Sequence, residues 1–107
     1  MTGFPQIRLP QAVVFDLEFT AWQGSWQRRW LAPGEFKELV QIGAVKITAD
    51  SFEELGALDV VARPRINPEL SDYLVALTGV RSERVTRDGV DFAGAYARFV
   101  NVACGPP

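Results

Sequence analysis

The sequence predicts an α/β fold that begins with an antiparallel sheet, and three observations support this prediction. Three short segments rich in β-branched and aromatic residues come first, and such segments are typical of strands. Segments with helix signals follow, and the last of them carries an apolar stripe. Of the 107 residues, 48% are hydrophobic, so a single domain of this size has a core to bury.

The three predicted strands come in quick succession. The first covers residues 12–19 and is apolar on both faces, which is typical of a central strand that is covered on both sides. The second covers residues 38–48, and the third covers residues 55–62. A turn at residues 49–51 follows the second strand, and the last two strands are close enough in the sequence for us to expect a hairpin.

Helical signals begin after the third strand. Asn67 or Ser71 is a candidate N-cap for the first helix, and Gly79 is placed to end it. We expect a short turn of helix at residues 82–85.

The final helix has the clearest pattern. Asp91 is its candidate cap, and apolar side chains recur at i, i+3, i+4, i+7 and i+8, which places them on one stripe. These side chains are Phe92, Ala95, Tyr96, Phe99 and Val100. The stripe needs a sheet to cover. Residues 101–104 are expected to leave the helix and begin a fourth strand.

The first strand carries the residues with the clearest chemical meaning, Asp16 and Glu18. Residues two apart on a strand point to the same face, so their carboxylates lie side by side after an apolar run. Two such charges repel each other unless one is protonated or a cation neutralises them. Hard divalent ions such as Mg²⁺ or Mn²⁺ prefer oxygen ligands. A solvated strand edge is the alternative interpretation of this pair. The Thr20 hydroxyl points to the same side if the strand continues.

Tryptophan and arginine alternate in the long connection after the first strand. Trp22, Trp26 and Trp30 are four residues apart, and Arg28 and Arg29 lie among them. Such interleaving can stack bases and contact phosphates. The spacing also suits packing on the sheet, which we expect for at least two of the indoles. Trp22 is nearest the carboxylates and is the best candidate for stacking on a base.

Three blocks together resemble the DnaQ-like DEDD exonucleases of the DEDDh type, in particular the branch that trims histone mRNA and small RNAs. Residues 16–20 match the first motif of this family, D-x-E-x-T. Residues 38–45 are similar to the family's second strand, and residues 66–73 with 77–80 are similar to that branch. The resemblance covers residues 12–100 and implies the N-terminal portion of an RNase H-like fold.

The resemblance also implies a function, which is 3′→5′ hydrolysis of phosphodiester bonds at the ends of single-stranded RNA or DNA. Asp16 and Glu18 would then be catalytic ligands of a two-metal site that holds Mg²⁺ or Mn²⁺. The nucleotide at the 3′ end would contact Phe19 and Thr20, and Trp22 would stack on it. Leu77 and Thr78 lie near the terminal base in the family's pattern. The predicted site therefore comprises these seven positions.

Two features of the sequence depart from the family. The family uses further aspartates and a histidine general base, but the chain contains no histidine. The second aspartate motif is also missing, so residues 1–107 are expected to form a truncated exonuclease domain with little activity of its own. The alternative is a non-catalytic module that binds nucleic acid or protein through a degenerate nuclease fold. An exposed sheet edge would allow self-association.

Composition limits the remaining function classes. The net charge is −2, so broad attraction to nucleic acid is not expected, and any contact must be local. The single cysteine allows no disulfide within the chain. No apolar run is long enough to span a membrane, and the N-terminus lacks the layout of a signal peptide. A cytoplasmic location is therefore the expectation.

Overall fold

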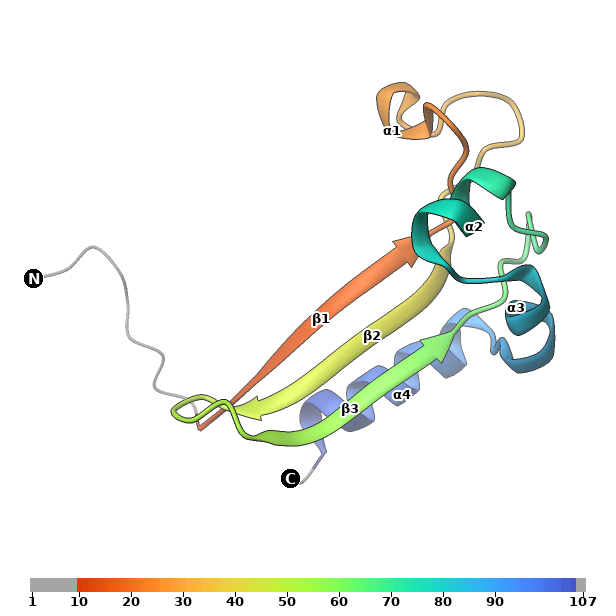
Figure 1. Ribbon diagram of the computed structural model, residues 1–107. Coiled ribbons are helices and arrows are strands. Elements are labelled where there is room, and N and C mark those ends of the chain that lie inside the picture. Colours follow the sequence, from red (N-terminus) through yellow and green to blue (C-terminus); the bar gives the residue numbers. More distant parts are fainter. Residues whose placement is uncertain (1–9, 106–107) are drawn as a thin grey trace, which may run out of the picture.

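A computed structural model describes residues 10–105 of the chain (Figure 1). The expected domain of residues 1–107 therefore extends beyond the described part at both ends. The elements, in order, are β1 (Gln11–Phe19), α1 (Ser25–Arg28), β2 (Leu39–Thr48), β3 (Glu54–Val61), α2 (Asp72–Thr78), α3 (Ser82–Asp88) and α4 (Phe92–Cys104). This order confirms the predicted α/β architecture with its antiparallel start.

The three strands form one antiparallel sheet in the order β1-β2-β3. The predicted hairpin is present, because β2 and β3 pair directly across a short connection. The expected position of β1 was wrong: β2 is the central strand, and β1 is the edge among the described residues. The apolar residues of β1 favour burial on both faces, but Val14 is 62% exposed. Self-association through this edge stays a prediction.

Helix α4 covers one face of the sheet and runs along β2 and β3 (Figure 1). Alternate side chains of β2 point toward it, so Ile42 is buried together with Ala95 of the helix. Phe15 of β1 reaches the same layer, where its ring lies 5.2 Å from that of Phe99. The residues of β1 that alternate with Phe15 therefore point to the opposite face of the sheet.

The other helices gather at the end of the sheet where β1 and β3 terminate (Figure 1). A second apolar cluster joins α2 and α3 to the sheet; its members are Val40, Val61, Leu70, Leu74, Val80 and Val85. Ser71 caps α2, since its hydroxyl accepts a hydrogen bond from the Leu74 N–H at 3.1 Å. Gly79 ends α2 with a φ of 76°, a left-handed conformation that glycine adopts without strain. None of the helices between residues 10 and 105 has the length and apolarity needed to cross a bilayer.

The expected fourth strand at residues 101–104 was wrong, because α4 continues through Cys104. The Gly105 N–H still donates to the Asn101 carbonyl at 3.0 Å. No glycine or proline interrupts the sequence between Gly94 and Gly105, so nothing local stops the helix earlier. Beyond its end, the buried Lys46 donates to the Gly105 carbonyl at 2.6 Å, which fastens this terminus to β2.

Candidate functional site

Asp16 and Glu18 lie on the face of β1 that is turned away from α4, opposite Gly43 and Gln41 of β2. Asp16 is exposed and Glu18 is half-buried. Burial raises the pKa of the Glu18 carboxyl, and the neighbouring charge of Asp16 raises this pKa further. The two carboxylates therefore lie close enough to interact, as the strand alternation predicted. A bound cation would reduce the repulsion between their charges.

The donor chemistry of this pair fits part of a site for a hard divalent ion. Two carboxylates supply oxygen ligands, whereas Mg²⁺ completes a shell of six with waters and substrate oxygens. Within residues 10–105 there is no group of three or more histidine, cysteine, aspartate or glutamate side chains placed to share an ion. A role of Asp16 and Glu18 as metal ligands therefore stays a prediction.

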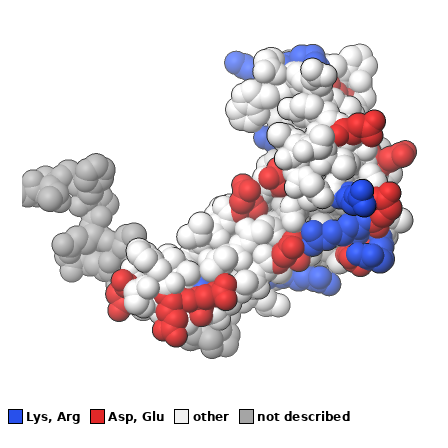
Figure 2. Space-filling view, in the orientation of Figure 1, with Lys and Arg blue, Asp and Glu red and all other residues white. Residues whose placement is uncertain are grey.

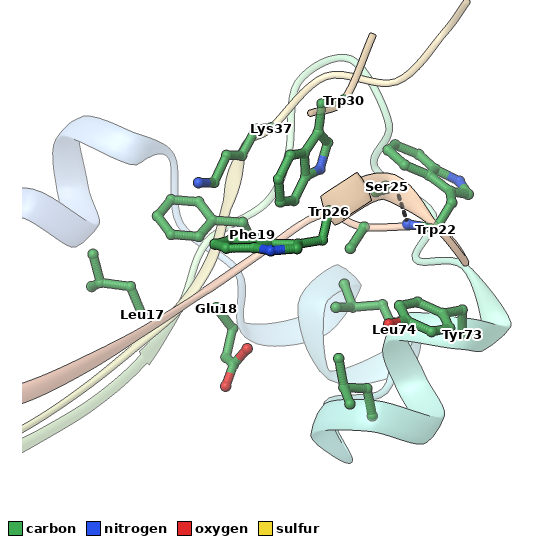
Figure 3. Close-up of a pocket in the computed structure, with 12 residues that line it drawn as sticks. Leu17, Glu18, Phe19, Trp22, Ser25, Trp26, Trp30, Lys37, Tyr73 and Leu74 are labelled. Atoms are coloured by element: carbon green, nitrogen blue, oxygen red, sulfur yellow. Dashed lines mark hydrogen bonds between the residues drawn. The ribbon is translucent and has the colours of Figure 1, made fainter. Parts of the chain in front are cut away.

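A pocket of about 310 Å³ lies beside Glu18 at the end of β1 (Figure 3). Its walls come from three segments: Phe19 at the end of the strand, Trp22 in the following loop, and Leu77 in α2. Leu77 is 65% exposed, so its side chain is available to a ligand. The structure therefore brings together, around one hollow, three of the residues expected to hold a terminal nucleotide.

Thr20 requires a correction, because its side chain is only 2% exposed and does not line the pocket. Its hydroxyl donates to the Phe36 carbonyl and accepts a hydrogen bond from the Glu38 N–H at 2.9 Å. The register shifts between Glu18 and Phe19, and such a bulge breaks the alternation of side chains along a strand. The hydroxyl consequently holds the ends of β1 and β2 together and does not face a ligand.

Thr78 also has its hydroxyl engaged within the chain. The hydroxyl donates to the Leu74 carbonyl at 2.8 Å and accepts from the Val80 N–H at 3.1 Å. These bonds belong to the end of α2. Thr78 therefore positions the helix that presents Leu77, and a direct contact of its side chain with a base stays a prediction.

The tryptophan-rich connection does not form a continuous helix, because α1 is only four residues long. Trp30 is packed, and its Nε1 donates to the Thr20 carbonyl at 2.7 Å. Trp22 is half-buried against the pocket. Trp26, in contrast, is 75% exposed. Trp22 and Trp30 are therefore partly buried and Trp26 is open to solvent, while the expected packing of two indoles on the sheet stays a prediction.

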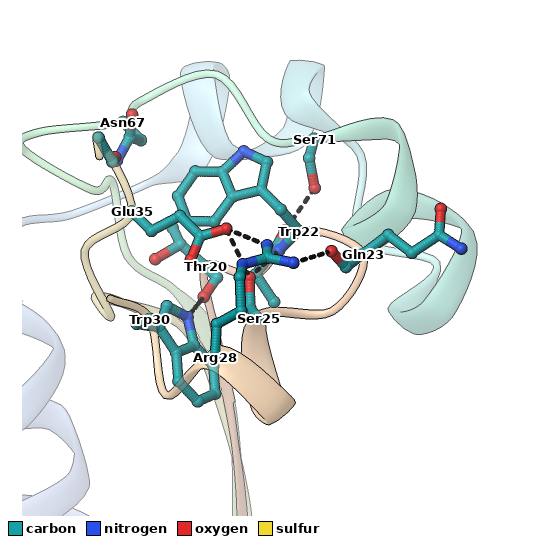
Figure 4. Close-up of polar contacts among 11 residues, drawn as sticks. Thr20, Trp22, Gln23, Ser25, Arg28, Trp30, Glu35, Asn67 and Ser71 are labelled. Atoms are coloured by element: carbon teal, nitrogen blue, oxygen red, sulfur yellow. Dashed lines mark hydrogen bonds and ion pairs between the residues drawn. The ribbon is translucent and has the colours of Figure 1, made fainter. Parts of the chain in front are cut away.

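A polar network holds this connection in shape (Figure 4). Arg28 forms an ion pair with Glu35, whose side chain is only 8% exposed. The hydrogen bond from Arg28 lowers the pKa of the Glu35 carboxyl. Ser25, which is buried, accepts from the Trp22 N–H at 2.7 Å and donates to the same carboxylate at 3.4 Å. The loop that carries the aromatic residues is therefore braced from inside.

Sequence reasoning missed Lys37 and Tyr73, which line the pocket together with Trp26. The Lys37 ammonium lies 4.7 Å from the ring centroid of Phe19 and 4.7 Å from that of Trp30. This distance is typical of cation–π contacts. A single lysine far along the chain from Phe19 carries no local signal, so only the fold reveals this contact.

Glu38 was also missed, although it anchors the segment that leads to α2. Its carboxylate accepts hydrogen bonds from three successive backbone N–H groups, those of Arg65, Ile66 and Asn67, at 2.7, 2.9 and 3.3 Å. Because an ionised acceptor strengthens such bonds, this contact ties the start of β2 to the loop that leads into α2. Helix α2 in turn forms one wall of the pocket.

Replacing Glu38 with alanine is expected to lower the free energy of unfolding by about 1–3 kcal/mol, because N–H groups at this junction lose their acceptor. Urea unfolding followed by circular dichroism measures the change. Glu38→Gln keeps one acceptor oxygen and is expected to lose less. Equal midpoints for the wild type and both variants would show that the contact does not stabilise the fold.

No family model and no curated protein matches the sequence, but solved structures match its fold. The nuclease domain of 3′hExo, a DEDDh family member bound to rAMP, has a TM-score of 0.72 and 24% identity over 88% of this chain and 44% of that one. A 3′-exonuclease solved with 3′-end recognition of the histone mRNA stem-loop has a TM-score of 0.70 and 25% identity, over 86% and 38%. Cell-death related nuclease 4 has a TM-score of 0.66 and 16% identity, over 84% and 28%.

These likenesses confirm the expected resemblance to the DEDDh exonucleases and the RNase H-like α/β fold. The chain spans less than half the length of each of these three structures. At such identities the comparison establishes the arrangement of the backbone, whereas the chemistry has to be argued from the side chains.

Proposed function

We propose that this chain carries the first carboxylate motif and the terminal-nucleotide pocket of a metal-dependent 3′→5′ exonuclease. The proposal rests on one observation. Glu18 lines an aromatic pocket, and Asp16 precedes it by two residues on the same face of β1 and raises its pKa, on a fold shared with 3′-exonucleases. A phosphodiester next to a nucleotide seated in that pocket would lie beside the carboxylates.

Each residue of the site would have a defined task. Asp16 and Glu18 would hold Mg²⁺ or Mn²⁺, and ions in such sites activate a water and stabilise the leaving oxygen of a phosphodiester. Phe19, Trp22 and Leu77 present apolar surface, which would stack on the base and exclude water from the terminal nucleotide. Thr20 and Thr78 would act through position, by holding the strand end and helix α2.

Single-stranded RNA or DNA is the substrate that this pocket suits. Its aromatic walls accept any base, since every base has a π-face. One structural neighbour was solved with rAMP and another with 3′-end recognition of a histone mRNA stem-loop, which supports a nucleotide as the ligand. The net charge of −2 favours recognition of a strand end over extended binding along a backbone.

The second candidate function is binding without hydrolysis. The chain has no histidine, and residues 10–105 offer two acidic ligands at the site but no cluster of three. A general base is worth about 10²- to 10⁴-fold in rate, so a site without one is expected to bind a 3′ end better than it cuts. This candidate uses the same pocket and differs only in turnover.

Digestion of a 5′-labelled single-stranded oligonucleotide in Mn²⁺ tests catalysis directly. We expect no ladder of shortened products beyond that of Asp16→Ala, while the same oligonucleotide binds in an anisotropy assay with Mg²⁺. A ladder that disappears in Asp16→Ala would establish hydrolysis and reject the expectation of low activity. Binding that is independent of metal and unchanged in Asp16→Ala would favour the binding module. Absence of binding under all conditions would reject both candidates.

A further inference from the structure

A second hollow of about 520 Å³ lies next to the nucleotide pocket and shares a wall with it. Trp26, Trp30 and Lys37 line both hollows, whereas Arg29 lines only the second one. In Figure 3 the Lys37 ammonium and the indoles of Trp26 and Trp30 stand together beside Phe19. We call the second hollow the outer hollow, and its lining is Trp26, Arg29, Trp30 and Lys37.

The outer hollow combines aromatic faces with positive charge. The Trp26 indole is 75% exposed and meets Trp30 edge to face, with 5.9 Å between ring centroids. None of the ion pairs between residues 10 and 105 involves Arg29 or Lys37. Figure 2 shows basic side chains at the end of the molecule that carries α1. Aromatic faces next to unpaired cations are typical of surfaces that bind single-stranded nucleic acid.

Backbone strain indicates that this arrangement is maintained at a cost. Arg29 and Trp30 both adopt left-handed conformations, with φ of 54° and 57°, which non-glycine residues rarely take. Such strain persists only where the surroundings enforce it, and it concentrates at functional sites. Here the hydrogen bond from Trp30 to the Thr20 carbonyl and the Arg28–Glu35 ion pair enforce it. Both residues with this strained backbone, Arg29 and Trp30, line the outer hollow.

We propose that the outer hollow binds the nucleotide that precedes the 3′-terminal nucleotide. Its base stacks on Trp26, and its phosphate contacts Arg29 and Lys37. This inference rests on the proposed function, because it places the terminal nucleotide in the pocket beside Glu18. The shared wall explains how two neighbouring bases bind, because the nucleic-acid strand continues from one side of Trp26 to the other. An oligonucleotide is therefore expected to bind more tightly than a mononucleotide.

The test compares two ligands in Ca²⁺: a 5′-labelled single-stranded octanucleotide, followed by anisotropy, and a nucleoside 5′-monophosphate, followed by calorimetry. Trp26→Ala is expected to weaken the octanucleotide about tenfold and the monophosphate by a smaller factor, because Trp26 also forms one side of the pocket beside Glu18. Trp26→Phe keeps an aromatic face and is expected to restore most of the affinity. An octamer with abasic sugars, which carries the same charge, is expected to bind Trp26→Ala and the wild type alike.

The charge of Arg29 is tested with Arg29→Asn, since asparagine tolerates a left-handed backbone. Loss of one phosphate contact is expected to make the slope of log K against log salt less negative by about 0.7. Arg98→Gln removes a charge from an exposed position of α4 and is expected to leave the slope unchanged.

The outcomes separate this inference from the function on which it rests. An octanucleotide that binds the wild type, Trp26→Ala and Arg29→Asn equally would overturn the outer hollow and leave the proposed function standing. Equal weakening of the octanucleotide and the monophosphate by Trp26→Ala would also overturn it, since one pocket would then account for all binding. If the wild type bound neither ligand, both proposals would fall.

Discussion

Replacing Leu74 with alanine is expected to lower the free energy of unfolding by about 2–5 kcal/mol. Leu74 is 1% exposed and lies in the apolar cluster that joins α2 and α3 to the end of the sheet. Truncation removes buried apolar surface and leaves a cavity, and the two losses add. A domain of this size has about 5–15 kcal/mol in total, so the variant is expected to lose a large share of its stability.

Urea unfolding, followed by tryptophan fluorescence, measures this loss. Leu77→Ala is the matched control, because it makes the same substitution in the same helix at a position that is 65% exposed. Its effect is expected to remain within about 0.5 kcal/mol. Comparable losses in the two variants would mean that α2 is not seated on the cluster as described, and the wall of the nucleotide pocket would be misplaced with it.

The elements could be predicted because their signals are local. Ser71, Gly79 and Asp91 act as caps in the structure, since a cap depends on the chemistry of a few neighbouring residues. The hairpin of β2 and β3 follows from the short turn between them. The place of β1 in the sheet had no local signal. An apolar strand favours cover on both faces, but only the pairing of the whole sheet decides which strand lies at an edge.

The candidate site could be predicted in part for the same reason. Strand alternation was enough to place Asp16 and Glu18 on one face. Alternation then failed at Thr20, because the register shift after Glu18 turns this residue into the interior. Lys37 and Glu38 meet their partners across long stretches of chain, and no spacing rule connects such residues. Contacts of this kind become predictable only after the strand ends are fixed in space.

Mn²⁺ is expected to stabilise the folded wild type at neutral pH, and this stabilisation is expected to disappear in Asp16→Asn. An ion that binds only the folded state, present at ten times its Kd, adds about 1.4 kcal/mol to the free energy of unfolding. The ion has to be shared by the two carboxylates, so the loss of either one is expected to abolish most of the effect. Thermal unfolding with and without Mn²⁺, at constant ionic strength, measures it.

The stabilisation by Mn²⁺ is expected to depend on pH through the ionisation of Glu18. The pKa of Glu18 is raised above its ordinary value of 4.5 by burial and by Asp16, so the folded state holds the proton more tightly than the unfolded state. Without metal, the contribution of Glu18 to stability is therefore present below pH 4.5 and is lost as the pH rises through the folded pKa. A bound cation favours the ionised carboxylate, so the Mn²⁺ effect is expected to grow over the same pH range.

A control at the other end of the sheet separates a metal site from simple screening of charge. Glu53 and Glu54 are exposed neighbours at the β2–β3 turn, and Glu53→Gln removes one charge of that pair. If Mn²⁺ acts by screening, this variant and Asp16→Asn should lose similar amounts of stabilisation. If Asp16 and Glu18 bind the ion, only Asp16→Asn and Glu18→Gln should lose it. Glu18→Gln should also be more stable than the wild type at neutral pH without metal, because it removes the charge that the fold disfavours. A metal site at Asp16 and Glu18 requires both effects, the loss of Mn²⁺ stabilisation in the two variants and the higher stability of Glu18→Gln without metal. A solvated strand edge would show neither effect.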